Sequence, residues 1–288
     1  MLTRLAIGVF WLLHFLPTRF LVAAGTGMGL LLMRLARARR NVVETNLRLC
    51  FPDLPEPERR QLRRRHFAAL GRALAESTIA WWSGAERVRR LATIEGWEHF
   101  DRFKDMPVIM FAPHFVGVDI LAIRISIESD AVSMYSQQKN PVFNRFLVGR
   151  RARFRPIRLV SRQDGIRPVI RGLKEGLPFF FLPDMDFGPR GSIFVPFFGV
   201  SAATITALSR VAALTGAAVV PVVISQRPDT GYRILIHPAL ENFPGESVEA
   251  DTRRMNAFIE ERVLEMPEQY YWVHKRFKTR PEGEPRIY

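Results

Sequence analysis

The chain has 288 residues, 48% of them hydrophobic, and a formal net charge of +14. This length and composition suffice for a sizeable core, and the excess of arginine implies an anionic partner: nucleic acid, anionic lipid or an acidic carrier protein. Nucleic acid is disfavoured because the arginines follow a hydrophobic amino terminus and no zinc-finger or RNP-type signature is present. The single cysteine, Cys50, excludes a disulfide within the chain and favours a reducing, cytoplasmic setting.

The amino terminus has the pattern of a membrane anchor. Two apolar runs, residues 5–16 and 20–33, are separated by Pro17, and four arginines follow within residues 34–40. By the positive-inside rule these arginines place the rest of the chain in the cytoplasm. The break at Pro17 leaves two modes open, a single span and a shallow interfacial insertion. Residues 34–90 hold 14 arginines against six acidic residues, which suits contact with anionic headgroups.

Behind the anchor (residues 1–40), hydrophobic periodicity predicts two helices, at residues 41–51 and from about 57 to 82. Strands and helices then alternate. Strands are predicted at 91–95, 107–112, 131–136, 156–160, 178–183, 193–197, 218–224 and 233–237. Helices are predicted at 117–127, 141–153, 164–175, 202–215 and 249–265. The alternation predicts an α/β fold, with a mixed sheet covered by helices, in one catalytic domain over residues 41–288.

The most informative motif is the His114/Asp119 pair. A buried apolar strand ends at Pro113, so His114 falls at the carboxyl end of a strand, where open α/β sheets bind ligands. Asp119 lies on the first turns of the helix that follows. A strand–turn–helix corner lets the carboxylate approach the imidazole and orient it as a general base for a hydroxyl. A merely structural pair has the same spacing, so the motif alone does not decide.

Two further segments hold candidate anion-binding groups. On the helix at 141–153, Arg145 and Arg150 are placed to hold an anionic group near His114. The segment 181–199 ends a strand with Asp184 and Asp186 and then carries Arg190 in a Gly/Pro turn suited to phosphate. No metal is expected there, because a third acidic or histidine ligand is lacking.

The small residues at 199–204 (GVSAAT), which end with Thr204, resemble a turn that opens a helix. Backbone N–H groups at such a turn suit an anion, although an ordinary helix cap explains the pattern equally well. No G-x-S-x-G elbow, Walker loop or dinucleotide fingerprint is present, so catalysis by a serine nucleophile is unsupported.

Several blocks together resemble the late acyltransferases of bacterial lipid A biosynthesis, of the lauroyl/myristoyl transferase type, within the lysophospholipid-acyltransferase superfamily. These blocks are NLRLCFPDLPEPER (46–59), APHFVGVD (112–119), QQKNPVFNRF (137–146), DMDFGPRGSIFVPFFGVSAAT (184–204) and PEQYYWVHKRFKTRPEGEP (267–285). The family's H-x4-D/E motif falls on His114 and Asp119, and its oxyanion or phosphate-contacting arginine falls on Arg150 or Arg145. The resemblance implies a glycerolipid-acyltransferase-like fold.

It also implies transfer of a fatty acyl chain of about C12–C14 from acyl carrier protein to a hydroxyl of a 3-hydroxyacyl chain on a Kdo-containing lipid A precursor. His114 is then the general base and Asp119 its orienter, with no covalent intermediate and no cofactor besides the carrier thioester. Gly117 and an arginine would stabilise the oxyanion. The implied partners are acyl carrier protein, an anionic glycolipid acceptor and inner-membrane lipids, with the catalytic domain on the cytoplasmic face. Candidate substrate-binding residues are Asp184, Asp186, Arg190, Thr204, Lys275 and Arg276.

Two alternatives stay open at this point. The first is an acyltransferase of the same chemistry that acts on another membrane lipid, such as a lysophospholipid or an ornithine lipid. A non-catalytic lipid-binding protein of the membrane surface would share the anchor and the arginines but would not need His114. Acyl-chain length, the acylated position and the oligomeric state do not follow from the sequence.

Overall fold

The computed structural model describes residues 1–288 and is built on a seven-stranded sheet in the order β1-β9-β8-β2-β5-β3-β4. All neighbouring pairs run parallel except β8 and β9, which are antiparallel. The mixed α/β sheet predicted from the sequence is therefore confirmed. The strands are β1 Ala92–Glu95, β2 Val108–Phe111, β3 Ala131–Tyr135, β4 Ile157–Ser161, β5 Phe179–Phe181, β6 Ser192–Phe197, β7 Val200–Ile205, β8 Ala218–Gln226 and β9 Tyr232–Ile236.

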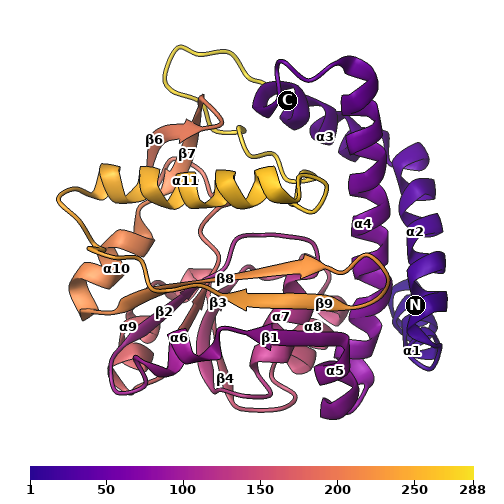
Figure 1. Cartoon of the computed structure of the whole chain (residues 1–288), viewed down its shortest axis with the longest axis horizontal. Helices are drawn as coiled ribbons and strands as arrows, with labels where there is room; N and C mark the ends of the chain where they lie inside the picture. The colour runs from indigo at the N-terminus through magenta and orange to yellow at the C-terminus, as the bar shows by residue number, and fades with distance from the viewer.

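Helices surround this sheet, and Figure 1 shows α11 crossing above β8 and β9 while α4 runs along one side of the molecule, between the sheet and α2. The helices are α1 Leu2–Leu13, α2 Thr18–Leu35, α3 Arg37–Cys50, α4 Glu56–Trp82, α5 Ala85–Leu91, α6 Trp97–Asp101, α7 Val118–Ile125, α8 Pro141–Arg151, α9 Arg167–Lys174, α10 Ala207–Thr215 and α11 Val248–Glu265, with a short 3-10 turn at Arg162–Asp164. Strand β2 is central and buried at all four positions, as expected of a parallel strand covered on both faces.

One predicted helix start is wrong. Residues 200–205 do not open a helix but form β7, which pairs antiparallel with β6 in a separate hairpin. The two-residue turn between them consists of Phe198 and Gly199, both with positive φ (50° and 74°), as in the tight turns that match strand twist. Helix α10 begins only at Ala207. The proposed helix-terminal anion cradle at 199–204 therefore does not exist.

Helix α2 packs directly on α4 through glycines. A Cβ atom on Gly29 would lie 2.0 Å from the carbonyl oxygen of Phe67, and one on Gly25 would lie 2.7 Å from that of Gly71. Only glycine lets two helix backbones approach this closely. The match of Gly25 with Gly71 and of Gly29 with Phe67 shows that the two helices run antiparallel. Helix α4 is buried at 14 of its 27 positions, and these include Phe67, Gly71 and Ala75 in the contact with α2.

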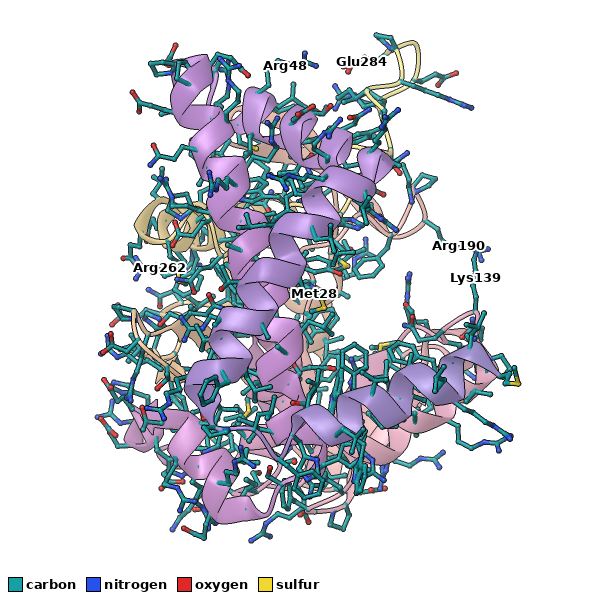
Figure 2. All side chains as sticks on the ribbon, turned by 90° about the vertical axis from the view of Figure 1, so that its right-hand side faces the viewer. Met28, Arg48, Lys139, Arg190, Arg262 and Glu284 are labelled. Carbon is teal, nitrogen blue, oxygen red and sulfur yellow. The ribbon has the colours of Figure 1, made fainter.

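The outer surfaces of α1 and α2 are apolar. Figure 2 shows α2 crossing α4 with Met28 near its middle, while α1 extends sideways from the lower end of α2. Helix α2 is the one helix whose length and composition suit a membrane span, and only 17% of that window is buried. Large hydrophobic side chains that remain exposed on these helices are Leu2, Leu5, Val9, Trp11, Leu12, Phe20, Leu31, Leu32 and Leu35, with Phe15 and Leu16 between the helices. This is most of the exposed large hydrophobic surface of the chain, which marks it as an interaction surface.

Candidate active site

His114 lies in the short loop that joins the carboxyl end of β2 to α7. The main chain of this loop is held on one side by the carboxy-terminal segment: the N–H of Tyr271 donates to the carbonyl of His114 (3.0 Å), and the N–H of Val116 donates to the carbonyl of Gln269 (2.7 Å). Phe115 also forms a β-bridge with Tyr270. His114, at the end of the central strand, is thereby held in place by a segment about 155 residues further along the chain.

Gly117 makes the corner between this loop and α7. Its φ of +87° is in the left-handed region, and a Cβ atom there would lie 2.7 Å from Cε1 of Tyr232. Tyr232 is fully buried, and its hydroxyl accepts a hydrogen bond from Gln226 (3.3 Å). From the sequence we expected Gly117 to supply a backbone N–H to an oxyanion. The structure shows that it is also required for the turn and for close packing on Tyr232.

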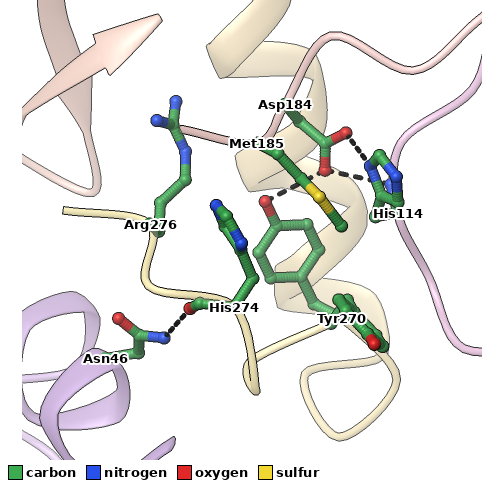
Figure 3. A pocket seen from close by; sticks show the side chains of 8 residues that line it. Asn46, His114, Asp184, Met185, Tyr270, His274 and Arg276 are labelled. Atoms are coloured by element: carbon green, nitrogen blue, oxygen red, sulfur yellow. Dashed lines mark hydrogen bonds and ion pairs between the residues drawn. The ribbon is translucent and has the colours of Figure 1, made fainter. Parts of the chain in front are cut away.

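The imidazole of His114 is held by Asp184, which follows β5, the strand next to β2. Nδ1 lies 2.6 Å from Oδ1 of Asp184, and the main-chain N–H of His114 donates to Oδ2 (2.9 Å). The hydroxyl of Tyr270 also donates to Oδ2 (3.1 Å). Figure 3 shows these three contacts converging on the carboxylate. An ionised carboxylate can only accept a hydrogen bond, so Nδ1 must donate and carries the proton. The lone pair of Nε2 is then free.

The protonation states around this pair follow from burial and charge. Burial alone would raise the pKa of Asp184, but the charge and hydrogen bonds of His114, with a contribution from Arg276, bring it below the ordinary value. Burial and the Asp184 charge raise the pKa of Tyr270 well above its usual range, so its hydroxyl stays a donor. The side chain of His114 is 17% exposed, whereas that of Asp184 is 1% exposed. The pair therefore has a buried anion behind a base that reaches the surface.

Asp119 lies elsewhere than expected. Its Oδ1 accepts two hydrogen bonds from Arg151, from Nε (2.9 Å) and Nη2 (2.5 Å), and it makes no hydrogen bond with His114. Asp119 is on the first turn of α7 and Arg151 is the last residue of α8. The carboxylate that contacts the imidazole is thus Asp184, and Asp119 instead positions an arginine.

The carboxylate of Asp186 is bonded to other parts of the chain and is not open to a substrate. Its carboxylate accepts from the main-chain N–H of Thr279 (2.6 Å), from the Thr279 hydroxyl (2.8 Å) and from the N–H of Gly188 (2.9 Å). Nε2 of His274 accepts from the main-chain N–H of Asp186 (2.8 Å). Burial and the charge of His114 lower the pKa of His274 to about 4, which keeps its ring neutral. The substrate contact expected of Asp186 is not available, because its oxygens are already engaged and buried.

Arg276 and Thr204 are also buried and face each other. Nη2 of Arg276 donates to the Thr204 hydroxyl, and Nη1 donates to the carbonyl of Ala203, both at 2.8 Å. The exposed fraction is 2% for Arg276 and 0% for Thr204. Neither is in a position to contact a substrate from solution. Lys275, in contrast, is exposed and lies over the Tyr288 ring.

The arginines singled out on α8 separate in space. Arg150 points back to α4, where it donates to the carbonyl of Trp81 (3.3 Å) and lies over Phe146. Arg145 is exposed. Arg151, one position further, is the arginine bonded to Asp119. Arg190 is exposed in its turn, and its side chain projects outward on the same side of the molecule as that of Lys139 (Figure 2).

Three contacts at the site were not predicted from the sequence. Asp184 was noted only as a substrate contact, although its place after a strand was the available signal. Arg151 was not singled out from its neighbour Arg150, because successive side chains on a helix point about 100° apart and the sequence does not show which of them faces Asp119. Tyr270 and Tyr271 lay within a recognised block, but nothing in their spacing pointed to the His114 loop. Asn46, His114, Asp184, Met185, Tyr270, Tyr271, His274 and Arg276 line one small polar cavity.

Comparison with known proteins places the chain in a family. Residues 1–279 match the family of the bacterial lipid A biosynthesis acyltransferases. The lipid A biosynthesis lauroyltransferase of Escherichia coli K12 is 34% identical over 291 residues, with 100% of this chain and 94% of the relative covered. The palmitoleoyltransferase of the same organism is 33% identical with the same coverage, and its myristoyltransferase is 33% identical over 259 residues, with 88% and 80% covered.

Among solved structures, that of the 1-acyl-sn-glycerophosphate acyltransferase from Thermotoga maritima is similar over 85% of this chain and 96% of its own, with a TM-score of 0.41 and 16% identity. The family match extends over almost the whole chain, and the relatives that share a third of its residues are only somewhat longer. The resemblance inferred from the sequence is confirmed: the chain belongs to the bacterial lipid A biosynthesis acyltransferases.

Proposed function

We propose that this enzyme transfers a fatty acyl chain of about C12–C14 from acyl carrier protein to a hydroxyl of a 3-hydroxyacyl chain on a Kdo-containing lipid A precursor. The observation that carries the proposal is the His114–Asp184 contact at the end of β2, which leaves Nε2 free at the surface. The names of the relatives support a lipid A acceptor and acyl chains of this kind.

In the proposed reaction, Nε2 of His114 accepts the proton of the acceptor hydroxyl as its oxygen attacks the thioester carbonyl carbon. The resulting tetrahedral oxyanion collapses, the carbon–sulfur bond breaks, and the thiolate of the carrier takes the proton from the imidazolium. Asp184 fixes the Nδ1–H tautomer and stabilises the imidazolium that forms between the two steps. No acyl-enzyme is required, and the carrier thioester is the only co-reactant.

Arg151 is the proposed partner of the developing negative charge. Nε and Nη2 are fixed by Asp119, which leaves Nη1 with no protein partner. An arginine whose fork is held by a carboxylate is pre-oriented for an oxyanion or a phosphate. In this proposal Asp119 acts through Arg151, and Arg145 and Arg190, both exposed, attract the phosphates and sugar carboxylates of the acceptor or the acidic carrier.

We propose that α1 and α2 attach the enzyme to the cytoplasmic leaflet of the inner membrane without α2 spanning it. Helix α2 lies antiparallel against α4 through Gly25 and Gly29, and α4 carries five arginines between residues 59 and 65 while packing on the domain. A transverse α2 would carry the stretch of α4 around Gly71, with its buried Arg72–Glu76 pair and the domain packed on it, into the hydrocarbon, where polar groups are costly to place. An interfacial position keeps the exposed apolar side chains in lipid and the arginines at the headgroups.

The decisive test is an assay of purified enzyme with carrier-bound acyl chains and two acceptors, a Kdo-bearing lipid A precursor and a lysophospholipid. We expect transfer to the first, and product mass spectra identify the chain. His114→Ala should lower the rate by about 10²–10⁴-fold or more with an unchanged melting temperature. Transfer only to lysophospholipid would refute the acceptor, and full activity of the variant would favour a non-catalytic lipid-binding protein.

A further inference from the structure

Behind His114 lies a small polar cavity of about 10 Å³, on the scale of one water molecule. Asp184 and Arg276 both line it, and Figure 3 shows Asp184 beside His114 and Arg276 on the side of the cavity away from His114. Asp184 is 1% exposed and Arg276 is 2% exposed. Two fully buried groups of opposite charge therefore border the same space.

Arg276 has no carboxylate within salt-bridge distance. Its two terminal nitrogens donate to neutral oxygens, those of Ala203 and Thr204. Nε is buried without a hydrogen-bond partner, and one face of the guanidinium lies over the Phe197 ring (5.1 Å). A buried cation without a nearby anion is costly, so some anion must balance this charge through space.

The other groups around the cavity leave Asp184 as that anion. Asp186 is also buried but has its own cation, Lys278, at 3.8 Å. On the open side, Asp119 is paired with Arg151, and Arg39 donates to the carbonyl of Val273. Glu260, whose charge acts on Cys50, is paired with Arg253 (2.8 Å). The remaining titratable neighbours are Tyr270, Tyr271, Tyr288, His274 and the buried thiol of Cys50. They are neutral, because burial raises the pKa of the tyrosines and of Cys50 and lowers that of His274.

We propose that Arg276 is a positioning residue for catalysis, whose buried charge keeps Asp184 ionised while His114 is neutral and ready to accept a proton. This inference rests on the proposed function, in which the His114–Asp184 pair is the base. A neutral His114 alone offers Asp184 only hydrogen bonds, whereas Arg276 offers a permanent charge at every working pH. The guanidinium is held away from solvent by Thr204, Ala203 and Phe197, so its field is weakly screened.

The sign of the effect follows from the charge. Removing a positive charge beside the pair makes it easier for the pair to bind a proton. The base is then lost at higher pH, and the acid limb of the pH–rate profile moves upward. For a buried charge that lines the same small cavity as Asp184, a shift of about one pH unit is expected.

The experiment compares pH profiles of kcat/KM for the wild type, Arg276→Met, Arg276→Gln and Arg276→Lys. Met and Gln should move the acid limb up by about one pH unit, and Lys should leave it near the wild-type position. The matched control is Arg124→Met, since Arg124 is also buried (7% exposed) but is bonded elsewhere, to the carbonyl of Ala92 and to Glu128. It should lower the melting temperature without moving the limb.

A second measurement does not depend on activity. Imidazole NMR titration of the purified protein, with the His114 signal identified by its loss in His114→Ala, should show the same upward shift in Arg276→Gln and not in Arg276→Lys. If neither the His114 titration nor the acid limb of the pH–rate profile moves in Arg276→Met and Arg276→Gln, the proposed role of Arg276 is wrong. A shifted titration in a protein that transfers no acyl chain would overturn the proposed function alone. If Arg276→Met does not fold, the comparison of Arg276→Gln with Arg276→Lys tests the proposal.

Discussion

Asp184 bonds to His114 twice, through the ring at Nδ1 and through the main-chain N–H, with one carboxylate oxygen for each (2.6 and 2.9 Å). The orientation of the imidazole and the position of the loop that carries it therefore depend on the same group. Any change in Asp184 alters both the tautomer and the distance of Nε2 from a substrate.

The first prediction concerns that carboxylate. Asp184→Asn is nearly isosteric but removes the charge and can present an N–H to Nδ1, which favours the wrong tautomer. We expect kcat to fall by about 10²–10⁴-fold, with a smaller effect on KM, in steady-state assays. Asp186→Asn is the matched control, because Asp186 is equally buried but bonds to Thr279 and Gly188. This control variant should lower the melting temperature but change kcat much less than Asp184→Asn does. Comparable kcat losses in the two variants would contradict the assignment.

A second prediction separates Asp119 from His114. If Asp119 acts by holding Arg151, then Asp119→Asn added to Arg151→Met costs little more than Arg151→Met alone. The coupling in a double-mutant cycle on kcat/KM should then lie between about 0.5 and 3 kcal/mol. The same cycle between Asp119 and Asp184 should show weaker coupling. Additive losses for Asp119 and Arg151 would instead mean that Asp119 acts directly on the base.

The glycine contact between α2 and α4 gives a third prediction. Gly29→Ala would place a Cβ 2.0 Å from the Phe67 carbonyl oxygen, so the helices must separate, at a cost of about 1–3 kcal/mol. Gly27 is in the same helix with nothing within 4 Å of its Cβ position, and Gly27→Ala should be neutral or stabilising by up to about 1 kcal/mol. Melting temperatures of the detergent-solubilised variants measure the difference. Equal melting temperatures would show that α2 does not pack on α4.

Acid sensitivity is the fourth prediction. Burial lowers the pKa of His66, His237 and His274 to about 4, whereas a histidine in the unfolded chain titrates near 6.5. Between these values the unfolded state binds more protons, so stability is complete above about pH 6.5 and falls as the pH drops towards 4. Fully buried His66 alone contributes about 3 kcal/mol to this fall.

Denaturant unfolding at pH 7.5, 6 and 5 tests this, with His66→Gln as the comparison because Gln retains a donor for the Glu268 carbonyl that Nδ1 of His66 contacts. The variant should lose less stability than the wild type as the pH falls. A wild-type stability that does not change over this range would contradict the neutral, buried state of these rings.

Most of the fold was accessible from the sequence because its strands are short apolar runs bounded by Pro, Gly and charged residues. The central strand and the His114 loop lay within a residue of their predicted places. The error at residues 200–205 has a physical source: small residues such as Ala202 and Ala203 favour helices locally, but pairing with β6 overrides that preference.

The site was harder to predict, because its contacts join residues far apart in the chain. A spacing of five made Asp119 the natural partner of His114, whereas Asp184 reaches it only because β5 lies beside β2. That order of strands is a property of the sheet and cannot be derived from local periodicity. The burial of Arg276 could not be predicted either, because a segment rich in basic and aromatic residues is typical of a protein surface. The structure shows that this segment folds inward.

The inward fold of this carboxy-terminal segment has a consequence for how the enzyme is made. The first 35 residues form the two apolar helices α1 and α2, while Tyr270 and Tyr271 complete the His114 loop and Thr279 closes over Asp186. If α1 and α2 attach to the membrane as proposed, the nascent chain can do so long before the His114 loop is complete. The proposed base would then form only after residues 270–279 have been made, so the growing chain would reach the lipid surface before it could act on it.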